Sequence, residues 1–128
     1  MTNLLIDTNI YSCALRGIAD VVFALQKAHS IGISSISIGE LFSGFKGGSK
    51  ERQNIEELED FLDSPRVRIY CVDENTAEFY AEILNGLKTR GTPIPTNDIW
   101  IAAVAFQHGL KFFTRDRHFE KIAGLVML

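Results

Sequence analysis

The chain has 128 residues, of which 46% are hydrophobic and 23% charged, and its formal net charge is −3 at pH 7. These values are ordinary for a globular protein and fit one domain, which we expect to span residues 1–128. The negative charge excludes a broadly basic surface for nucleic acid, although it does not exclude a local one. The two cysteines lie inside apolar segments rather than at a paired spacing, so we expect free thiols and a cytoplasmic protein. The longest apolar run, residues 99–106, is far shorter than the roughly 20 residues of a membrane span, so no membrane segment is expected.

Short apolar runs alternate with longer helical patterns along the chain. The expected strands are, in chain order, residues 4–6, 33–36, 67–72 and 111–113, with residues 125–128 as a further edge strand. The expected helices are residues 10–15, a segment capped by Asp20, a segment opening at Ser37, residues 51–62, a segment from Asp73 to Gly91, a segment from Thr96 or Asn97 to Gly109, and a brief helical turn over 119–123. This alternation predicts an α/β sandwich of three layers, with a mainly parallel central sheet flanked by helices.

Residues 94–118 are the stretch around which the rest of the chain is organised. Every residue from 99 to 106 is apolar, so this helix has no polar face and belongs in the core. Asp98 lies in its first turn, where a carboxylate gains from the positive end of the helix dipole. The following strand delivers Thr114 and Asp116 to its carboxyl end. Two carboxylates are therefore fixed to rigid parts of the core.

Two further acidic residues, Asp7 and Glu40, closely follow predicted strands. Ligands of such sheets bind beyond the carboxyl ends of the strands, so we expect both to meet Asp98 and Asp116 there. Each acid also has an ordinary explanation. Asp7 suits a helix cap, and Ser37 with Glu40 matches a capping box, which is the favoured role for Glu40 taken alone. Capping does not predict that all four acids fall at one edge of one sheet.

Electrostatic repulsion limits what such a group of acids can do. Two carboxylates ~4 Å apart repel by about 4 kcal/mol at an effective dielectric constant near 20. Four of them must take up protons or share a cation. Carboxylate oxygens without a nearby histidine suit Mg²⁺ or Mn²⁺, and His118 is expected only to follow the group in the chain. A metal held in this way would activate water and neutralise a phosphate.

Four motifs together resemble the PIN-domain ribonucleases, and most of all the VapC-like toxins of bacterial toxin–antitoxin pairs. They are L-I-D-T-N near the start, S-I-G-E-L after the second strand, P-T-N-D-x-x-I-A-A, and F-x-T-R-D-x-x-F. The resemblance implies a PIN-like sandwich with a metal-binding and catalytic set of Asp7, Glu40, Asp98 and Asp116, supporting roles for Asn9 and Thr114, and RNA contacts by Arg115 and Arg117. It also implies Mg²⁺ or Mn²⁺ as cofactor, an RNA substrate, a small antitoxin protein that blocks the site, and a homodimer.

The leading hypothesis is a Mg²⁺-dependent endoribonuclease in which metal-activated water hydrolyses the phosphodiester. An inactive PIN-like module that binds only RNA or a partner is the first alternative. A receiver-type phosphoacceptor domain would use Asp7 and Asp73, but it needs a second acid beside Asp7 and a lysine after the last core strand. Lys111 lies at the start of that strand and not after it. A phosphatase with a D-x-D motif is disfavoured because Asn9 occupies the place of the second acid.

Overall fold

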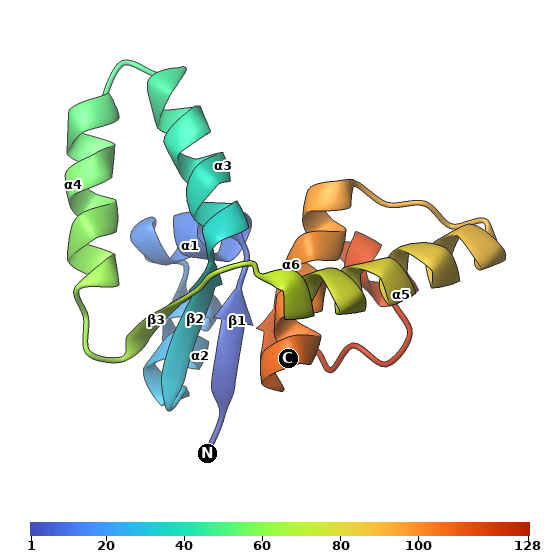
Figure 1. Ribbon diagram of the computed structural model, residues 1–128. Helices are drawn as coiled ribbons and strands as arrows, with labels where there is room; N and C mark the ends of the chain where they lie inside the picture. Colours follow the sequence, from blue (N-terminus) through green and yellow to red (C-terminus); the bar gives the residue numbers. More distant parts are fainter.

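The computed structural model describes residues 1–128 and contains a four-stranded parallel sheet between two groups of helices (Figure 1). The strands are β1 (Asn3–Ile6), β2 (Ser30–Ser34), β3 (Val67–Tyr70) and β4 (Lys111–Phe113), in the spatial order β3-β2-β1-β4. The helices are α1 (Thr8–Leu15), α2 (Ala19–Lys27), α3 (Ser35–Lys46), α4 (Glu51–Leu62), α5 (Glu74–Arg90), α6 (Thr96–His108) and the short 3₁₀ helix η1 (Arg117–Lys121). None of them has both the length and the apolar composition needed to cross a bilayer. The predicted α/β sandwich is confirmed.

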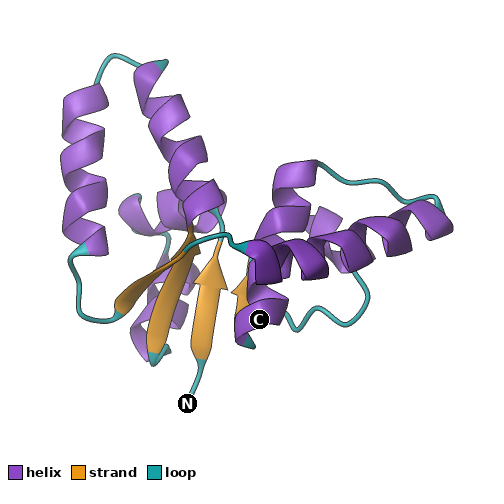
Figure 2. Ribbon diagram, viewed as in Figure 1, coloured by secondary structure: helices purple, strands orange, loops and turns teal.

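The side chains of β1 alternate between two buried cores, one on each face of the sheet. Leu4 and Ile6 belong to the core that includes α1 and α2, whereas Leu5 packs in the other core with residues of α5 and α6. A parallel strand covered on both faces has no solvent side, which explains why residues 4–6 of β1 are all apolar. The α3–α4 hairpin extends beyond the carboxyl ends of the strands (Figure 2). The sheet therefore presents that edge between the hairpin and the α5–α6 pair.

Strand β2 and helix α3 both begin earlier than predicted. The strand covers Ser30–Ser34 instead of residues 33–36. Ser34 is the cap of α3, because its hydroxyl accepts a hydrogen bond from the Ser37 amide at 3.1 Å. Ser37 is consequently the third residue of the helix and is buried, so the predicted capping box of Ser37 with Glu40 is wrong. Capping no longer explains Glu40, which lies inside α3.

The boundaries of the two helices α5 and α6 follow the sequence signals more closely. Asp73 caps α5 with a complete capping box. Gly91 and Gly109 end α5 and α6 in the left-handed conformation, with φ of 66° and 62°, which costs glycine little because it has no Cβ. The predicted start and stop of α5 and the predicted stop of α6 are confirmed.

Two predicted helix caps are wrong. Ile18, not Asp20, occupies the cap position of α2, and Asp20 lies in the first turn of that helix. Pro95 precedes α6 without a side-chain cap, so neither Thr96 nor Asn97 caps this helix. The polar side chains near both helix starts are thus free to make longer-range contacts.

The segments predicted at the outer edges of the sheet are shorter than expected. Strand β3 ends at Tyr70 rather than at residue 72, because its partner β2 ends at Ser34, directly opposite Tyr70. Residues 125–128 contribute a single bridge between Met127 and Phe112 instead of a strand. The helical turn predicted over 119–123 is η1, which begins two residues earlier.

Gly32 lies in the middle of β2. A Cβ at this position would lie 2.6 Å from Cε2 of Tyr70 and 3.0 Å from the carbonyl oxygen of Leu4. We therefore expect Gly32→Ala to lower the free energy of unfolding by about 2–3 kcal/mol in urea denaturation. Gly44→Ala is the control, because nothing lies within 4 Å of its Cβ position on α3. It should raise stability by roughly 0.5–1 kcal/mol. Equal stability of Gly32→Ala and the wild type would contradict this packing.

Candidate metal centre

The four predicted acids lie on elements that meet at the carboxyl edge of the sheet (Figure 1). Asp7 follows β1, Glu40 lies in α3, Asp98 is in the first turn of α6, and Asp116 follows β4. The charges of the other three carboxylates each raise the pKa of Asp98, so the four groups share one electrostatic environment. They are termed the acidic cluster below.

Asp7 is the most buried member of the acidic cluster, with 7% of its surface exposed. Its Oδ1 accepts a hydrogen bond from the Ile10 amide at 2.9 Å, and its Oδ2 accepts one from Thr114 Oγ1 at 2.5 Å. The Thr114 hydroxyl in turn accepts a hydrogen bond from the Asp116 amide at 2.9 Å. Burial raises the pKa of Asp7, the bonds from Thr114 and Ile10 oppose this, and the Asp116 and Glu40 charges add to it. Asp7 therefore caps α1 and also joins β1 to the loop after β4.

Glu40 is held by two residues that the sequence analysis did not identify. Thr8 Oγ1 donates a hydrogen bond to Oε1 of Glu40 at 3.1 Å, and Asn97 Nδ2 donates one to Oε2 at 3.4 Å. Both donors are next to a cluster acid in the sequence, and this adjacency was the available signal. Asn9, the predicted supporting amide, is exposed and makes no side-chain hydrogen bond to the cluster.

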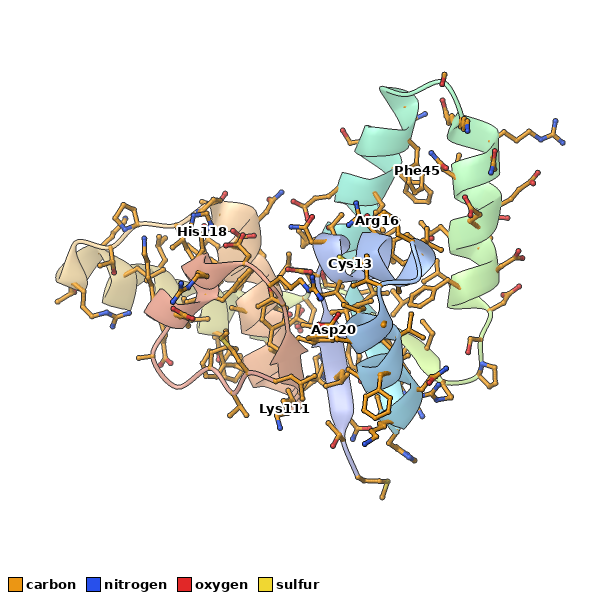
Figure 3. All side chains as sticks on the ribbon, turned by 180° about the vertical axis from the view of Figure 1, so that it is seen from behind. Cys13, Arg16, Asp20, Phe45, Lys111 and His118 are labelled. Carbon is orange, nitrogen blue, oxygen red and sulfur yellow. The ribbon has the colours of Figure 1, made fainter.

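A histidine also lies beside the cluster, so the expectation of a site without a nearby histidine is wrong. His118 Nδ1 is 3.1 Å from Asp116 Oδ1 and 3.9 Å from Asp98 Oδ2. One ligand atom from each of these three residues lies within 4.8 Å of the other two. The cause is local, because Asp116 caps η1 by accepting the His118 amide at 2.9 Å and so holds residue 118 next to itself. Figure 3 shows His118 on this short helix, seen from behind.

The two arginines after β4 have different surroundings. Nη2 of Arg115 is 2.6 Å from each of the two carboxylate oxygens of Asp20, which lies on α2 and is labelled in Figure 3. This pair ties the loop after β4 to α2. Arg117 is 87% exposed, with its Nε 3.7 Å from Glu120. Contact of either arginine with RNA stays a prediction, and the surroundings of Arg117 leave its side chain more available.

Asp98 is the acid whose ionisation the fold opposes most clearly. Burial, followed by the charges of Asp116 and Glu40, raises the pKa of Asp98 from an ordinary 3.8 to about 6. A carboxyl group whose negative charge is disfavoured by other carboxylates gains free energy when a cation arrives. The site can therefore attract a divalent ion. Without an ion at neutral pH, the negative charge of Asp98 is disfavoured by burial and by the neighbouring carboxylates.

This shift predicts how pH affects the stability of protein kept in chelator. A raised carboxyl pKa stabilises the fold fully below the unfolded value of 3.8, and the contribution is lost as pH rises through about 6. Asp98→Asn removes the carboxyl group that ionises, so the stability of the variant should vary less than that of the wild type between pH 4 and 7. At pH 8 the variant should be more stable than the wild type by roughly 1–2 kcal/mol. A pKa shift of one unit corresponds to about 1.4 kcal/mol, and solvent screening makes the effect of this shift on stability smaller than the full conversion gives. Urea denaturation across this pH range tests it, and a variant less stable than wild type at pH 8 would contradict it.

Comparison with known proteins identifies relatives over the whole length of the chain. The PIN domain family matches residues 4–125. Ribonuclease VapC2 of Rickettsia felis is 30% identical, covering 96% of this chain and 94% of the relative. Toxin FitB of Neisseria gonorrhoeae is 36% identical, covering 88% and 87%. The crystal structure of VapBC2 from Rickettsia felis bound to a promoter DNA fragment superimposes with a TM-score of 0.88 at 28% identity, covering 99% of this chain and 98% of that one.

These matches agree with the architecture. The resemblance predicted from the motifs is confirmed by a family match that spans nearly all residues. The chain belongs to the PIN domain family, and within it the chain is similar to the VapC ribonucleases.

Proposed function

We propose that this chain is a Mg²⁺-dependent endoribonuclease and the toxin of a type II toxin–antitoxin pair. The observation that carries the proposal is the acidic cluster, whose four carboxylates come from distant parts of the chain to one edge of the sheet. The names of its relatives, which include Ribonuclease VapC2 and Toxin FitB, support the same activity.

The donor set fits a hard divalent cation. Carboxylate oxygens are the ligands that Mg²⁺ and Mn²⁺ prefer, and the acidic cluster supplies them from Asp7, Glu40, Asp98 and Asp116. Burial raises the pKa values of Asp7 and Asp98, the neighbouring carboxylate charges add to this, and a cation among the four acids offsets that repulsion. When bound, the ion lowers the pKa of water and neutralises charge on the phosphate.

The protein's own contribution is to hold the carboxylates in place before substrate arrives. Thr114 fixes Asp7, while Thr8 and Asn97 fix the two oxygens of Glu40. Ligands held by such hydrogen bonds need little reorganisation during the reaction. A carboxylate oxygen of the cluster accepts the proton that the attacking water loses. Hydrolysis by water needs no nucleophilic side chain, so no covalent intermediate is expected.

The proposal includes three partners: the RNA substrate, a small antitoxin protein that blocks the acidic cluster, and a second copy of the chain in a homodimer. Relatives of similar fold were solved as VapBC and FitAB assemblies, which supports an antitoxin partner. The phosphoacceptor alternative has less support, because Asp73 is engaged as the cap of α5 and accepts a hydrogen bond from Gln107. Cleavage in the cytoplasm is the expected setting.

The direct test is cleavage of labelled RNA by the purified chain. We expect cleavage with Mg²⁺, loss of cleavage to the background rate with EDTA, and recovery when Mg²⁺ or Mn²⁺ is added in excess. The physical reason is that the carboxylates alone repel an anionic phosphodiester. Cleavage that persists in EDTA would contradict the proposal. Metal binding without cleavage of any RNA would favour the inactive binding module instead.

A further inference from the structure

We propose that His118 donates a nitrogen ligand to the same metal centre and shifts its preference from Mg²⁺ towards transition ions such as Mn²⁺ and Co²⁺. This inference rests on the proposed function, because it concerns the ion that the acidic cluster holds. It changes the expected chemistry of the site from oxygen ligands alone to a mixed set of oxygen and nitrogen.

The separations between the donor atoms carry the argument. Ligands at about 2.1 Å from a shared ion are about 3.0 Å apart when adjacent and about 4.2 Å apart when opposite, in octahedral geometry. His118 Nδ1 is 3.1 Å from Asp116 Oδ1, which matches adjacent ligands, and 3.9 Å from Asp98 Oδ2, which lies between the two values. Both distances fit ligands of one ion, and one ligand atom from each of the three residues lies within 4.8 Å of the other two.

The backbone, and not only the side chain, keeps the imidazole at this position. The His118 amide donates to Asp116 Oδ1 at 2.9 Å, and the Thr114 hydroxyl accepts the amide of Asp116 at 2.9 Å. Thr114 is itself bound to Asp7 in the acidic cluster. The loop that presents Asp116 thus presents His118 with it, and 49% of the histidine side chain is exposed, so the ring is reachable by an incoming ion.

Neither of the other histidines can serve this role. The ring of His108 packs 4.7 Å from the ring of Tyr70. His29 lies just before β2, where its amide donates to the carbonyl oxygen of Thr2 at the opposite end of the strand from the acidic cluster. His118 is accordingly the single imidazole available to the centre, and His29 offers a matched control.

An imidazole ligand has a predictable effect on the choice of ion. Imidazole nitrogen binds transition metals better than it binds Mg²⁺, and affinity rises from Mn²⁺ to Co²⁺ for a given nitrogen-containing site. His118→Gln replaces the imidazole with an amide, whose neutral oxygen can still bind an ion, and so removes the imidazole nitrogen ligand. We therefore expect the affinity for Co²⁺ to fall by roughly 10–100-fold, while the affinity for Mg²⁺ changes by less than about 3-fold.

Pulsed electron paramagnetic resonance on the purified full chain with Mn²⁺ tests the ligand directly. We expect a nitrogen hyperfine coupling that changes when the histidines are labelled with ¹⁵N, disappears in His118→Gln and persists in His29→Gln. Titration calorimetry with Co²⁺ and Mg²⁺ on the same proteins measures the change in ion preference. The labelled wild type needs no substitution, so misfolding of a variant cannot imitate the result.

The outcomes separate this inference from the proposed function. Absence of a histidine coupling in wild type, or an unchanged Co²⁺ affinity in His118→Gln, overturns the role of His118, even where Mg²⁺-dependent RNA cleavage is intact. Absence of any RNA cleavage, with the coupling present, overturns the proposed function and leaves the ligand assignment standing. A chain that binds no divalent ion overturns both.

Discussion

Replacing Asp98 with Asn should lower the rate of Mg²⁺-dependent RNA cleavage by roughly 10²–10³-fold. The substitution keeps the shape of the side chain and removes one negative charge from the acidic cluster. Loss of a charged ligand costs several kcal/mol of transition-state stabilisation, and each 1.4 kcal/mol is about tenfold in rate. The pKa of Asp98, raised to about 6 by burial and by the neighbouring acids, marks it as the group that gains most from a cation.

Single-turnover cleavage with saturating enzyme measures this effect apart from RNA affinity. The matched control is Asp60→Asn, because Asp60 is exposed on α4, outside the acidic cluster, and forms no ion pair. It removes the same charge from the chain and should cleave at the wild-type rate. An Asp98→Asn protein that is folded and cleaves as fast as Asp60→Asn would show that the cluster is not the reaction centre.

Addition of Mn²⁺ should raise the melting temperature of the wild type markedly. Free Mn²⁺ at about 100 times its Kd adds about 2.7 kcal/mol to the stability of the folded state. For a chain of this size, that corresponds to a rise of roughly 8–12 °C. The wild type gains both from the new metal–ligand bonds and from relief of the repulsion between Asp7, Glu40, Asp98 and Asp116.

The same titration with Asp98→Asn should give a much smaller rise. In chelator this variant should have a higher melting temperature than the wild type, because it lacks the negative charge that burial and the other acids disfavour at position 98. The two melting curves should therefore change order when Mn²⁺ is added. Parallel shifts in both proteins would mean that Mn²⁺ binds elsewhere on the chain.

The helix stops and the strand next to the site could be predicted because they depend on local chemistry. Gly91 and Gly109 end helices because of the left-handed backbone that follows the last turn. Strand β4 was predicted with its observed bounds, residues 111–113, because its apolar run follows a glycine stop and ends at a polar residue. These features depend only on residues that are close in the sequence, so they can be predicted without knowledge of the fold.

The errors arose where a distant contact decides the outcome. The sequence offers three serines as possible caps of α3: Ser34, Ser35 and Ser37. Strand β2 pairs with β3 as far as Ser34 opposite Tyr70, and this pairing makes Ser34 the cap. An isolated glycine usually indicates a turn or a break, yet here Gly32 lies within β2 and the ring of Tyr70 covers it. Each choice depends on the third strand, more than thirty residues further along the chain.

In the candidate site, too, some features could be predicted from the sequence and others depend on distant contacts. The meeting of the four acids at one edge of the sheet could be predicted, because the carboxyl ends of parallel strands lie at the same edge. The contacts around them could not, since Thr8 and Asn97 reach Glu40 from two other elements. His118 was expected only to follow the acids in the chain, because its approach to them depends on the tight turn that Asp116 caps.

The most direct test of the central claim, that the four acids share a divalent ion, is to locate that ion. Crystals grown with Mn²⁺ should give an anomalous diffraction peak at the carboxyl edge of the sheet, within about 2.6 Å of oxygens from Asp98 and Asp116 and bordered by Asp7 and Glu40. A crystal saturated with Mn²⁺ that shows the peak elsewhere, or shows none, would contradict the claim.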